Sequence, residues 1–158
     1  MTEQQILAKL TALCSGAEHC SYEMTEKMHR WEVDEATQAR VMEYLTREKY
    51  VDDSRFCRAF TKEKMRFNKW GRRKIELALY QKRIDKSVSA EALDEVDASE
   101  YVAILRPLLK QKERSVKANN EYEKNMKLIK FAMSRGFTFD VIKECLTGDM
   151  DEIDEEPC

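Results

Sequence analysis

The sequence predicts an all-α protein of three tandem three-helix, helix-turn-helix-like modules in an elongated array. The chain of 158 residues contains only 4 Gly and 2 Pro, which leaves little turn chemistry for a sheet-rich fold. An apolar triplet with steps of four and five residues also recurs at a period of about 51 residues. Its three occurrences are Met24, Met28 and Val33; Ile75, Leu79 and Ile84; and Leu128, Ala132 and Phe137.

The first module is predicted for residues 1–50. Apolar residues at helical spacing mark a helix that ends near Gly16. A second helix begins at Ser21, and Asp34 opens a third, because a short polar side chain there accepts hydrogen bonds from free backbone N–H groups. This order of three short helices is the pattern that we expect the chain to repeat.

The second module is predicted for residues 51–97. It comprises a helix over Asp52–Asn68, a helix over Gly71–Arg83, and a short helix after Asp85. Gly71 breaks the helical pattern, so we expect a tight joint at that residue, which serves either a close approach between two helices or a positive φ.

The third module is predicted for residues 98–148, before an acidic tail over 149–158. Its first helix contains Pro107, which must kink the helix or mark a restart, so the boundary there stays open. A helix over Glu121–Arg135 ends at Gly136, and a last short helix follows.

Positive charge is concentrated inside a chain whose formal net charge is −2. From Ser54 to Lys86 there are 12 Lys and Arg against 3 acidic residues, and residues 106–135 form a second basic zone. Opposite charges are usually interspersed on a surface that only confers solubility. The contrast therefore predicts an acidic partner, of which nucleic acid is the commonest.

Composition also limits cofactors and location. The sequence has no run of 18 apolar residues and no apolar signal core after Met1, so we expect a cytoplasmic protein with no membrane partner. Five cysteines are an odd number without paired spacing, as is ordinary in a reducing compartment. Cys14, His19 and Cys20 are too few for a structural zinc site, so no metal and no cofactor is expected.

Two segments of the second module resemble the hallmark of the RecX family of bacterial recombinase regulators. They are Tyr50-Val51-Asp52-Asp53-Ser54-Arg55-Phe56-Cys57-Arg58-Ala59-Phe60 and Gly71-Arg72-Arg73-Lys74-Ile75-Glu76-Leu77-Ala78-Leu79. Cys57 stands where Ala is usual, Lys74 where Arg is usual, and Arg83-Ile84 replaces a closing Gly-Ile. Weaker likeness covers residues 5–147.

The resemblance implies a monomer without catalytic activity that acts in DNA recombination, DNA repair and the SOS response. Its expected partner is the RecA filament on single-stranded DNA, with the DNA contacted directly or through the filament. The protein would suppress filament extension, ATP hydrolysis, co-protease action and strand exchange.

The hallmark residues divide by predicted role. Asp52 and Asp53 are expected to cap a helix rather than to act as an acid–base pair. Phe56 and Phe60 are expected in the core, together with Ile75 beyond the Gly71 joint. The predicted partner-binding residues are Arg58, Lys62, Arg66, Lys69, Trp70, Arg72, Arg73, Lys82, Lys110, Arg114, Lys117 and Lys127.

Two further basic and aromatic features leave alternatives open. Trp70 either stacks on a base or anchors a partner, although burial against the neighbouring module is the favoured interpretation. The second basic face comprises Arg106, Lys110, Lys112, Arg114, Lys117, Lys124, Lys127 and Lys130. Charge alone does not decide between DNA and acidic protein patches.

Two other function classes compete with a recombinase regulator. A helix-turn-helix transcription regulator needs a recognition helix with Arg, Asn or Gln, and the acidic segment 85–97 offers few such groups. A helical-repeat adaptor would contact only proteins. An enzyme is least supported, because the sequence shows no nucleophile–base pair, phosphate loop or metal-ligand cluster.

Overall fold

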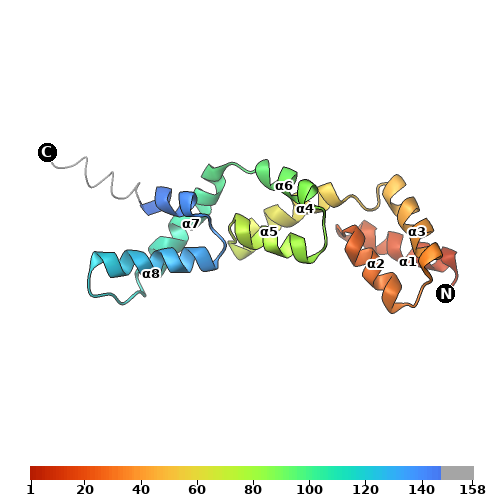
Figure 1. Cartoon of the computed structure of the whole chain (residues 1–158), viewed down its shortest axis with the longest axis horizontal. Coiled ribbons are helices and arrows are strands. Elements are labelled where there is room, and N and C mark those ends of the chain that lie inside the picture. The colour runs from red at the N-terminus through yellow and green to blue at the C-terminus, as the bar shows by residue number, and fades with distance from the viewer. Residues whose placement is uncertain (147–158) are drawn as a thin grey trace. The chain divides into compact units, whose positions relative to one another are not determined.

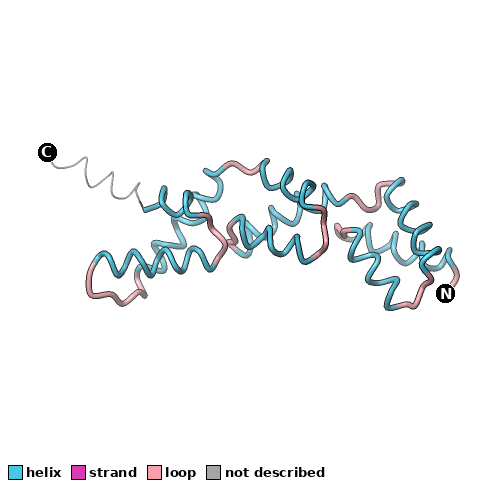
Figure 2. The backbone as a smooth tube through the Cα atoms, in the orientation of Figure 1, coloured by secondary structure: helices cyan, strands magenta, loops and turns pink. Residues whose placement is uncertain are grey.

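The computed structural model describes residues 1–146, and within that range it contains helices and loops but no strand (Figures 1 and 2). The predicted all-α class is therefore confirmed. The elements are α1 (Glu3–Gly16), α2 (Ser21–Arg30), α3 (Glu35–Arg47), α4 (Asp53–Glu63), the π-helix η1 (Lys64–Asn68), α5 (Arg72–Gln81), α6 (Lys86–Asp94), α7 (Ala98–Glu113) and α8 (Glu121–Ser134). Residues 139–146 form a further helix.

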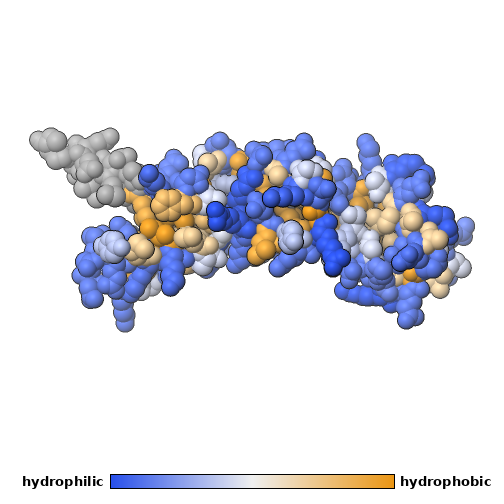
Figure 3. All heavy atoms as spheres, viewed as in Figure 1, coloured by the Kyte–Doolittle hydropathy of each residue, from blue (hydrophilic) through white to orange (hydrophobic). Residues whose placement is uncertain are grey.

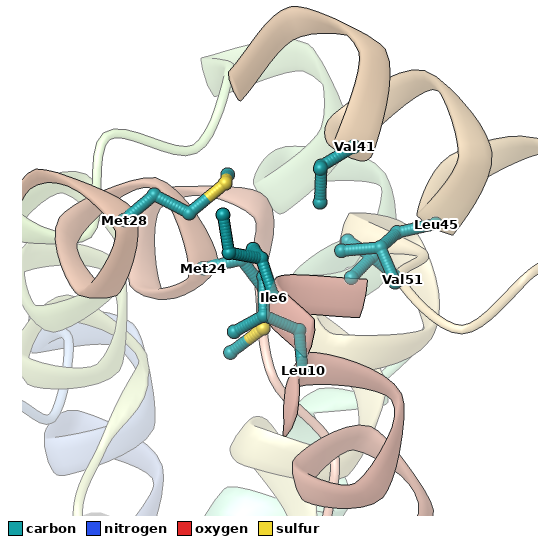
Figure 4. Packing of buried hydrophobic residues seen from close by; sticks show 7 residues of the cluster. All are labelled: Ile6, Leu10, Met24, Met28, Val41, Leu45 and Val51. Atoms are coloured by element: carbon teal, nitrogen blue, oxygen red, sulfur yellow. The ribbon is translucent and has the colours of Figure 1, made fainter. Parts of the chain in front are cut away.

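The first three helices enclose a small apolar core (Figure 4). Both α1 and α2 pack against α3, and the two buried side chains that each helix contributes to this core are four residues apart. The buried members are Ile6, Leu10, Met24, Met28, Val41, Leu45 and Val51. Thr2 and Gln5 form a capping box at α1, and the Asp34 carboxylate accepts the Thr37 N–H at α3, as the sequence predicts.

The second group of helices contains a wider, π-helical turn, which the sequence pattern does not predict. The predicted helix over Asp52–Asn68 is real, but its last five residues are the π-helix η1. Buried residues recur in steps of four at Cys57, Thr61 and Met65. A step of four residues is longer than one α-helical turn of 3.6 residues, so side chains at this spacing gradually rotate around an α-helix. The π turn contains more residues per turn and therefore keeps the buried side chains on one face.

The third group begins with α7, whose first turn carries a capping box of Asp97 and Glu100. Pro107 lies inside α7, so the helix passes through the proline without a restart. The apolar face of α7 packs against both α8 and η1. Its buried side chains are Tyr101, Val102, Leu105 and Leu109.

The repeated apolar triplet marks the same local structure three times. Its nine members are buried or partly buried, and the third member always follows a residue with positive φ. Those residues are Glu32 (φ 55°), Arg83 (φ 54°) and Gly136 (φ 91°). In each case the N–H of the next residue donates to a carbonyl five residues earlier: Val33 to Met28, Ile84 to Leu79, and Phe137 to Ala132.

Described by internal contacts, the chain forms two compact units. Unit 1 contains residues 1–60 and 78–93, and unit 2 contains residues 61–77 together with the described chain from residue 94 to residue 146. Both α4 and α5 contribute residues to each unit. The predicted module limits at residues 50 and 97 stay predictions.

Two further sequence predictions concern membrane helices and the acidic tail. Over residues 1–146, no helix combines the length and the apolar character that crossing a membrane requires. The predicted acidic tail over 149–158 lies outside the described residues.

Candidate basic interface

In unit 2, the last turn of α4, η1 and its following residue, and the first turn of α5 carry a dense group of cations, which we call the η1 surface. Its members are Lys62, Lys64, Arg66, Lys69, Arg73 and Lys74. Within residues 1–146, no carboxylate lies within 4.0 Å of the charged groups of Lys62, Arg66, Lys69 or Arg73. Arg73 acts electrostatically on Asp140, but Lys62, Arg66 and Lys69 have no such acidic neighbour among the described residues, so their charges can attract anions.

η1 ends in a turn whose residues are mostly exposed. The Lys69 and Trp70 N–H groups both donate to the Lys64 carbonyl, and Lys69 adopts the left-handed conformation with φ 57°. Only Met65 of η1 is buried, whereas residues 66–69 are exposed. The positive φ considered for Gly71 therefore belongs to Lys69.

Trp70 is half-buried, and its ring already has cationic neighbours. The Lys74 ammonium lies 4.9 Å from the ring centroid, and the Lys64 ammonium lies 5.3 Å from it. Phe67 differs, since 71% of it is exposed and one guanidinium, that of Arg66, lies 5.4 Å from its ring centroid. The more accessible aromatic ring is therefore that of Phe67, which is not among the binding residues predicted from sequence.

The start of α5 is fixed by backbone contacts with the end of α8 in the same unit. The Gly71 N–H donates to the Arg135 carbonyl at 2.8 Å, and the Arg73 N–H donates to the Gly136 carbonyl at 2.9 Å. The free donors of one helix start thus satisfy the free acceptors of another helix end. This pairing orients Arg73 and Lys74 on the η1 surface.

Arg72 is bound internally. Its guanidinium lies 2.7 Å from Asp94 and 3.6 Å from Glu76. Burial alone would lower the pKa of Arg72, but the hydrogen bond and the charge of Asp94 raise it overall. The structure therefore places Arg72 in an ion pair that links α5 to the end of α6, unlike its neighbour Arg73.

The paired aspartates of the hallmark have different partners. Asp52 caps its own helix, α4, because its carboxylate accepts the Arg55 N–H at 3.1 Å. Asp53 instead accepts the Ser21 N–H at 2.8 Å and the Ser21 hydroxyl at 2.6 Å. Asp53 thus caps the start of α2, so both residues are structural, but only Asp52 acts at the helix start where the sequence predicts it.

Two cations predicted for binding lie in unit 1, and both have partners. The Lys82 ammonium lies 3.2 Å from the Glu23 carboxylate and 5.9 Å from the Phe56 ring centroid. The Arg58 guanidinium donates to the Ser54 hydroxyl at 2.9 Å. Lys82 therefore joins α2 to the end of α5, next to the contact between Asp53 and Ser21.

The second predicted basic face, on α7, α8 and their connecting loop, is partly neutralised. Lys127 is paired with Glu123, and Lys124 is paired with Glu113 and Glu121. The Lys112 ammonium lies 5.1 Å from the Phe131 ring centroid and is half-buried. The cations that stay exposed without an ion pair among the described residues are Arg106, Lys110, Arg114, Lys117 and Lys130.

The visible surface is mostly hydrophilic, with apolar side chains gathered over the helix of residues 139–146 (Figure 3). Phe139 is 60% exposed and Met133 is 54% exposed. The candidate metal ligands do not form a group: Cys14 Sγ lies 3.7 Å from Met24 Sδ, and Cys20 is buried. Burial raises the pKa of the Cys20 thiol to about 11.

Two family models match this chain. Residues 52–93 match the second three-helix domain of RecX, and residues 99–146 match the third three-helix domain. Together these segments cover more than half of the chain. It belongs to the RecX family. RecX is a family of regulatory proteins rather than of enzymes. The chain is therefore assigned to a family of regulatory proteins.

Individual RecX relatives agree with the assignment. The regulatory protein RecX of Clostridioides difficile (strain 630) is 30% identical over 146 residues, which are 91% of this chain and 68% of that protein. The RecX protein of Clostridium tetani is 33% identical over 115 residues, which are 72% of this chain. The matched segment spans about half of the Clostridium tetani protein, 52% of its length.

Solved RecX structures share the fold. The crystal structure of RecX from Lactobacillus salivarius superposes with a TM-score of 0.86 at 16% identity, over 92% of this chain and 95% of that one. At such low identity the likeness concerns the fold, and it confirms the tandem three-helix arrangement. The departures from the RecX hallmark also have local reasons: Cys57 is a small buried residue, and Lys74 lies over the Trp70 ring.

The residues that pair with the candidate cations escaped prediction from sequence. Glu23 and Asp94 are 59 and 22 residues away from their partners Lys82 and Arg72. No local pattern reports such distant pairs. The exposed Phe67 did carry a signal, because it lies off the buried four-residue series and among cations.

Proposed function

We propose that this protein binds RecA filaments on single-stranded DNA and inhibits them. Binding would restrain filament extension, and with it ATP hydrolysis, co-protease action and strand exchange. The observation that carries the proposal is the η1 surface, where Lys62, Arg66 and Lys69 have no acidic partner among the described residues, in a chain of the RecX family.

The charge distribution supports an anionic target. Among the cations near η1, Lys62, Arg66 and Lys69 have no carboxylate within 4.0 Å in the described chain, while other basic residues, such as Arg72 and Lys82, hold the fold together. Nucleic acid and the acidic patches of a recombinase both offer dense negative charge. A filament presents the two together, so a surface rich in Lys and Arg fits it well.

A helix-turn-helix transcription regulator receives no support from the third helix. In α3, the candidate base-reading side chains Arg40 and Arg47 are paired with glutamates, Arg40 with Glu3 at 2.8 Å and Arg47 with Glu48 at 3.5 Å. A recognition helix needs such groups to be available for base edges. We therefore propose no duplex-reading role.

The deciding experiment is RecA-dependent ATP hydrolysis on single-stranded DNA, measured with increasing amounts of this protein. Substoichiometric protein is expected to lower the rate, because each bound copy blocks extension for many protomers. An unchanged rate over a range of salt concentrations would contradict the proposal. Gel filtration is expected to show elution at the monomer position.

A charge-reversed variant locates the site. Arg66→Glu combined with Arg73→Glu is expected to abolish inhibition while leaving the helical circular dichroism spectrum unchanged, since both side chains are exposed. Arg72 is kept, because its ion pair with Asp94 belongs to the fold. Arg30→Glu, an exposed arginine at the end of α2, is the matched control and is expected to inhibit like the unmodified chain.

A further inference from the structure

Phe67 is the more exposed of the two aromatic rings beside the η1 surface, and no apolar contact within residues 1–146 covers it. It lies in η1 with 71% of its surface exposed, while Met65 two residues earlier is buried. Leaving a phenyl ring in water forgoes burial that stabilises a folded protein. An exposed apolar ring within a charged surface is typical of a binding site.

The surroundings of Phe67 are cationic. The Arg66 guanidinium lies 5.4 Å from the Phe67 ring centroid, and Lys69 follows two residues later in the left-handed conformation. Glu63, one turn earlier, is the only acid between residues 62 and 69. A flat apolar ring next to unneutralised cations matches the two parts of a nucleotide, its base and its phosphate.

Trp70 is less suited to the same role. Trp70 is half-buried and has ammonium groups at 4.9 and 5.3 Å from its ring centroid, so less of its surface than of Phe67 is open to a base. The cations over Trp70 instead hold that side chain in place between η1 and α5. Of the two aromatic residues beside the η1 surface, Phe67 is therefore the one more available to a ligand.

We propose that Phe67 stacks on an unpaired base of single-stranded DNA while Arg66 and Lys69 bind the flanking phosphates. A phenyl ring has no hydrogen-bonding group, so the contact is independent of base identity. Bases within a duplex are already stacked on each other, so the contact selects single strands. The inference rests on the proposed function and deepens it, because it assigns direct DNA contact to the η1 surface.

The test is fluorescence anisotropy of a labelled oligothymidylate of about 20 nucleotides with the full chain, without RecA. Phe67→Ala is expected to weaken binding about 5- to 100-fold, and Phe67→Trp is expected to retain it. Tyr122→Ala is the matched control: Tyr122 is 74% exposed in the same unit, but it lies between Glu121 and Glu123. This control is expected to bind like the unmodified chain.

The salt dependence of DNA affinity separates the contribution of the Phe67 ring from that of the neighbouring charges. Phe67→Ala is expected to leave the slope of affinity against salt unchanged, whereas Lys69→Gln lowers it by about 0.7, the value for one phosphate contact on a single strand. A duplex of equal length is expected to bind the Phe67→Ala variant and the unmodified chain with the same affinity. Equal oligothymidylate affinity for Phe67→Ala and the unmodified chain would overturn the inference.

The ATP-hydrolysis assay distinguishes this inference from the proposed function. If the unmodified chain binds the oligothymidylate through Phe67 but does not slow RecA, the inference holds and the proposed function fails. If Phe67→Ala binds the oligothymidylate normally but no longer inhibits RecA, the ring contacts the recombinase, and the inference is overturned.

Discussion

The backbone N–H of Gly71 donates to the carbonyl of Arg135 at a distance of 2.8 Å, across 64 residues of sequence. Gly71 permits this approach because it lacks a side chain: an added Cβ atom would lie 2.4 Å from the Phe137 Cα. Gly136 faces it with a similar limit, since its own added Cβ would lie 2.5 Å from the Lys74 backbone nitrogen. The hallmark glycine of the family thus joins α5 to the end of α8.

Gly71→Ala is therefore expected to lower the free energy of unfolding by about 3 kcal/mol, because the opposing atoms are backbone atoms that cannot rotate away. Urea denaturation followed by circular dichroism measures this loss. Gly16→Ala is the matched control, because no atom lies within 4 Å of an added Cβ at that helix end. It is expected to change stability by less than about 1 kcal/mol. Equal losses in both variants would disprove the close-approach explanation.

Asp53 is expected to stabilise the start of α2 rather than that of its own helix. Asp53→Ala removes two hydrogen bonds to Ser21 and is expected to cost about 2 kcal/mol. Ser21→Ala removes only the hydroxyl bond and is expected to cost about 1 kcal/mol. In a double-mutant cycle, urea midpoints should show coupling between the two residues. Additive effects would mean that the hydroxyl contact contributes nothing to stability.

Glu32 and Arg83 hold backbone conformations that favour glycine. Glu32→Gly at φ 55° is expected to raise the free energy of unfolding by up to about 1 kcal/mol, since it removes left-handed strain at a helix end. Glu32→Val, which is β-branched, is expected to destabilise the fold. Thermal unfolding of the two variants compares them directly, and a stabilising valine would contradict the argument.

Arg83→Gly restores the Gly-Ile that is usual in the family and relieves the same strain at φ 54°. It also removes the Arg83 guanidinium from its position 5.3 Å from the Tyr22 ring centroid. We therefore expect a smaller gain than for Glu32→Gly, as measured by thermal unfolding. The two variants together report how much the Tyr22 contact offsets the backbone strain.

Stability in acid is expected to depend on Glu23. Burial raises the pKa of Glu23, but the hydrogen bond from the Cys20 N–H and the pairing with Lys82 outweigh it, so the pKa lies below its ordinary value of 4.5. A carboxyl group whose pKa is lower in the folded state stabilises the fold above the ordinary pKa. That stability is lost as pH falls from about 4.5 through the lower folded-state value.

Glu23→Gln should make the urea midpoint less dependent on pH in this window. The helix-capping residues Asp34, Asp85 and Asp97 also have lowered pKa values, because Thr37, Ser87 and Ser99 donate hydrogen bonds to them. Some acid sensitivity is therefore expected to remain in the variant. An identical pH profile for Glu23→Gln and the unmodified chain would show that the Lys82 pairing does not favour the folded state.

Local sequence patterns were sufficient for the helices and for much of the core. Asp34 marks a helix start because a cap acts within three residues of itself. Ile75, Leu79 and Leu128 are buried because helical spacing puts them on one face. The sequence did not predict the π turn at η1, and it left the helix boundary at Pro107 open. Packing against other helices overrides local preference at both places.

The candidate site was predictable only in part. Arg66 and Lys69 are exposed and lack acidic partners in the described chain, as a binding role requires, whereas Arg72 and Lys82 are bound by acids far away in sequence. A count of charges along the sequence cannot separate these two kinds of cation, because it carries no information on the distances between charged groups in the folded chain. The binding roles themselves stay proposals.

By itself, the sequence determined the all-α class and the threefold apolar triplet, because helix periodicity and caps act over only a few residues, and its hallmark segments indicated the RecX family by resemblance. The tertiary structure decided which helix Asp53 caps, that Gly71 faces the end of α8, and that Phe67 rather than Trp70 is the accessible ring. Each of these depends on contacts between residues far apart in the chain. Such contacts form only when the helices pack.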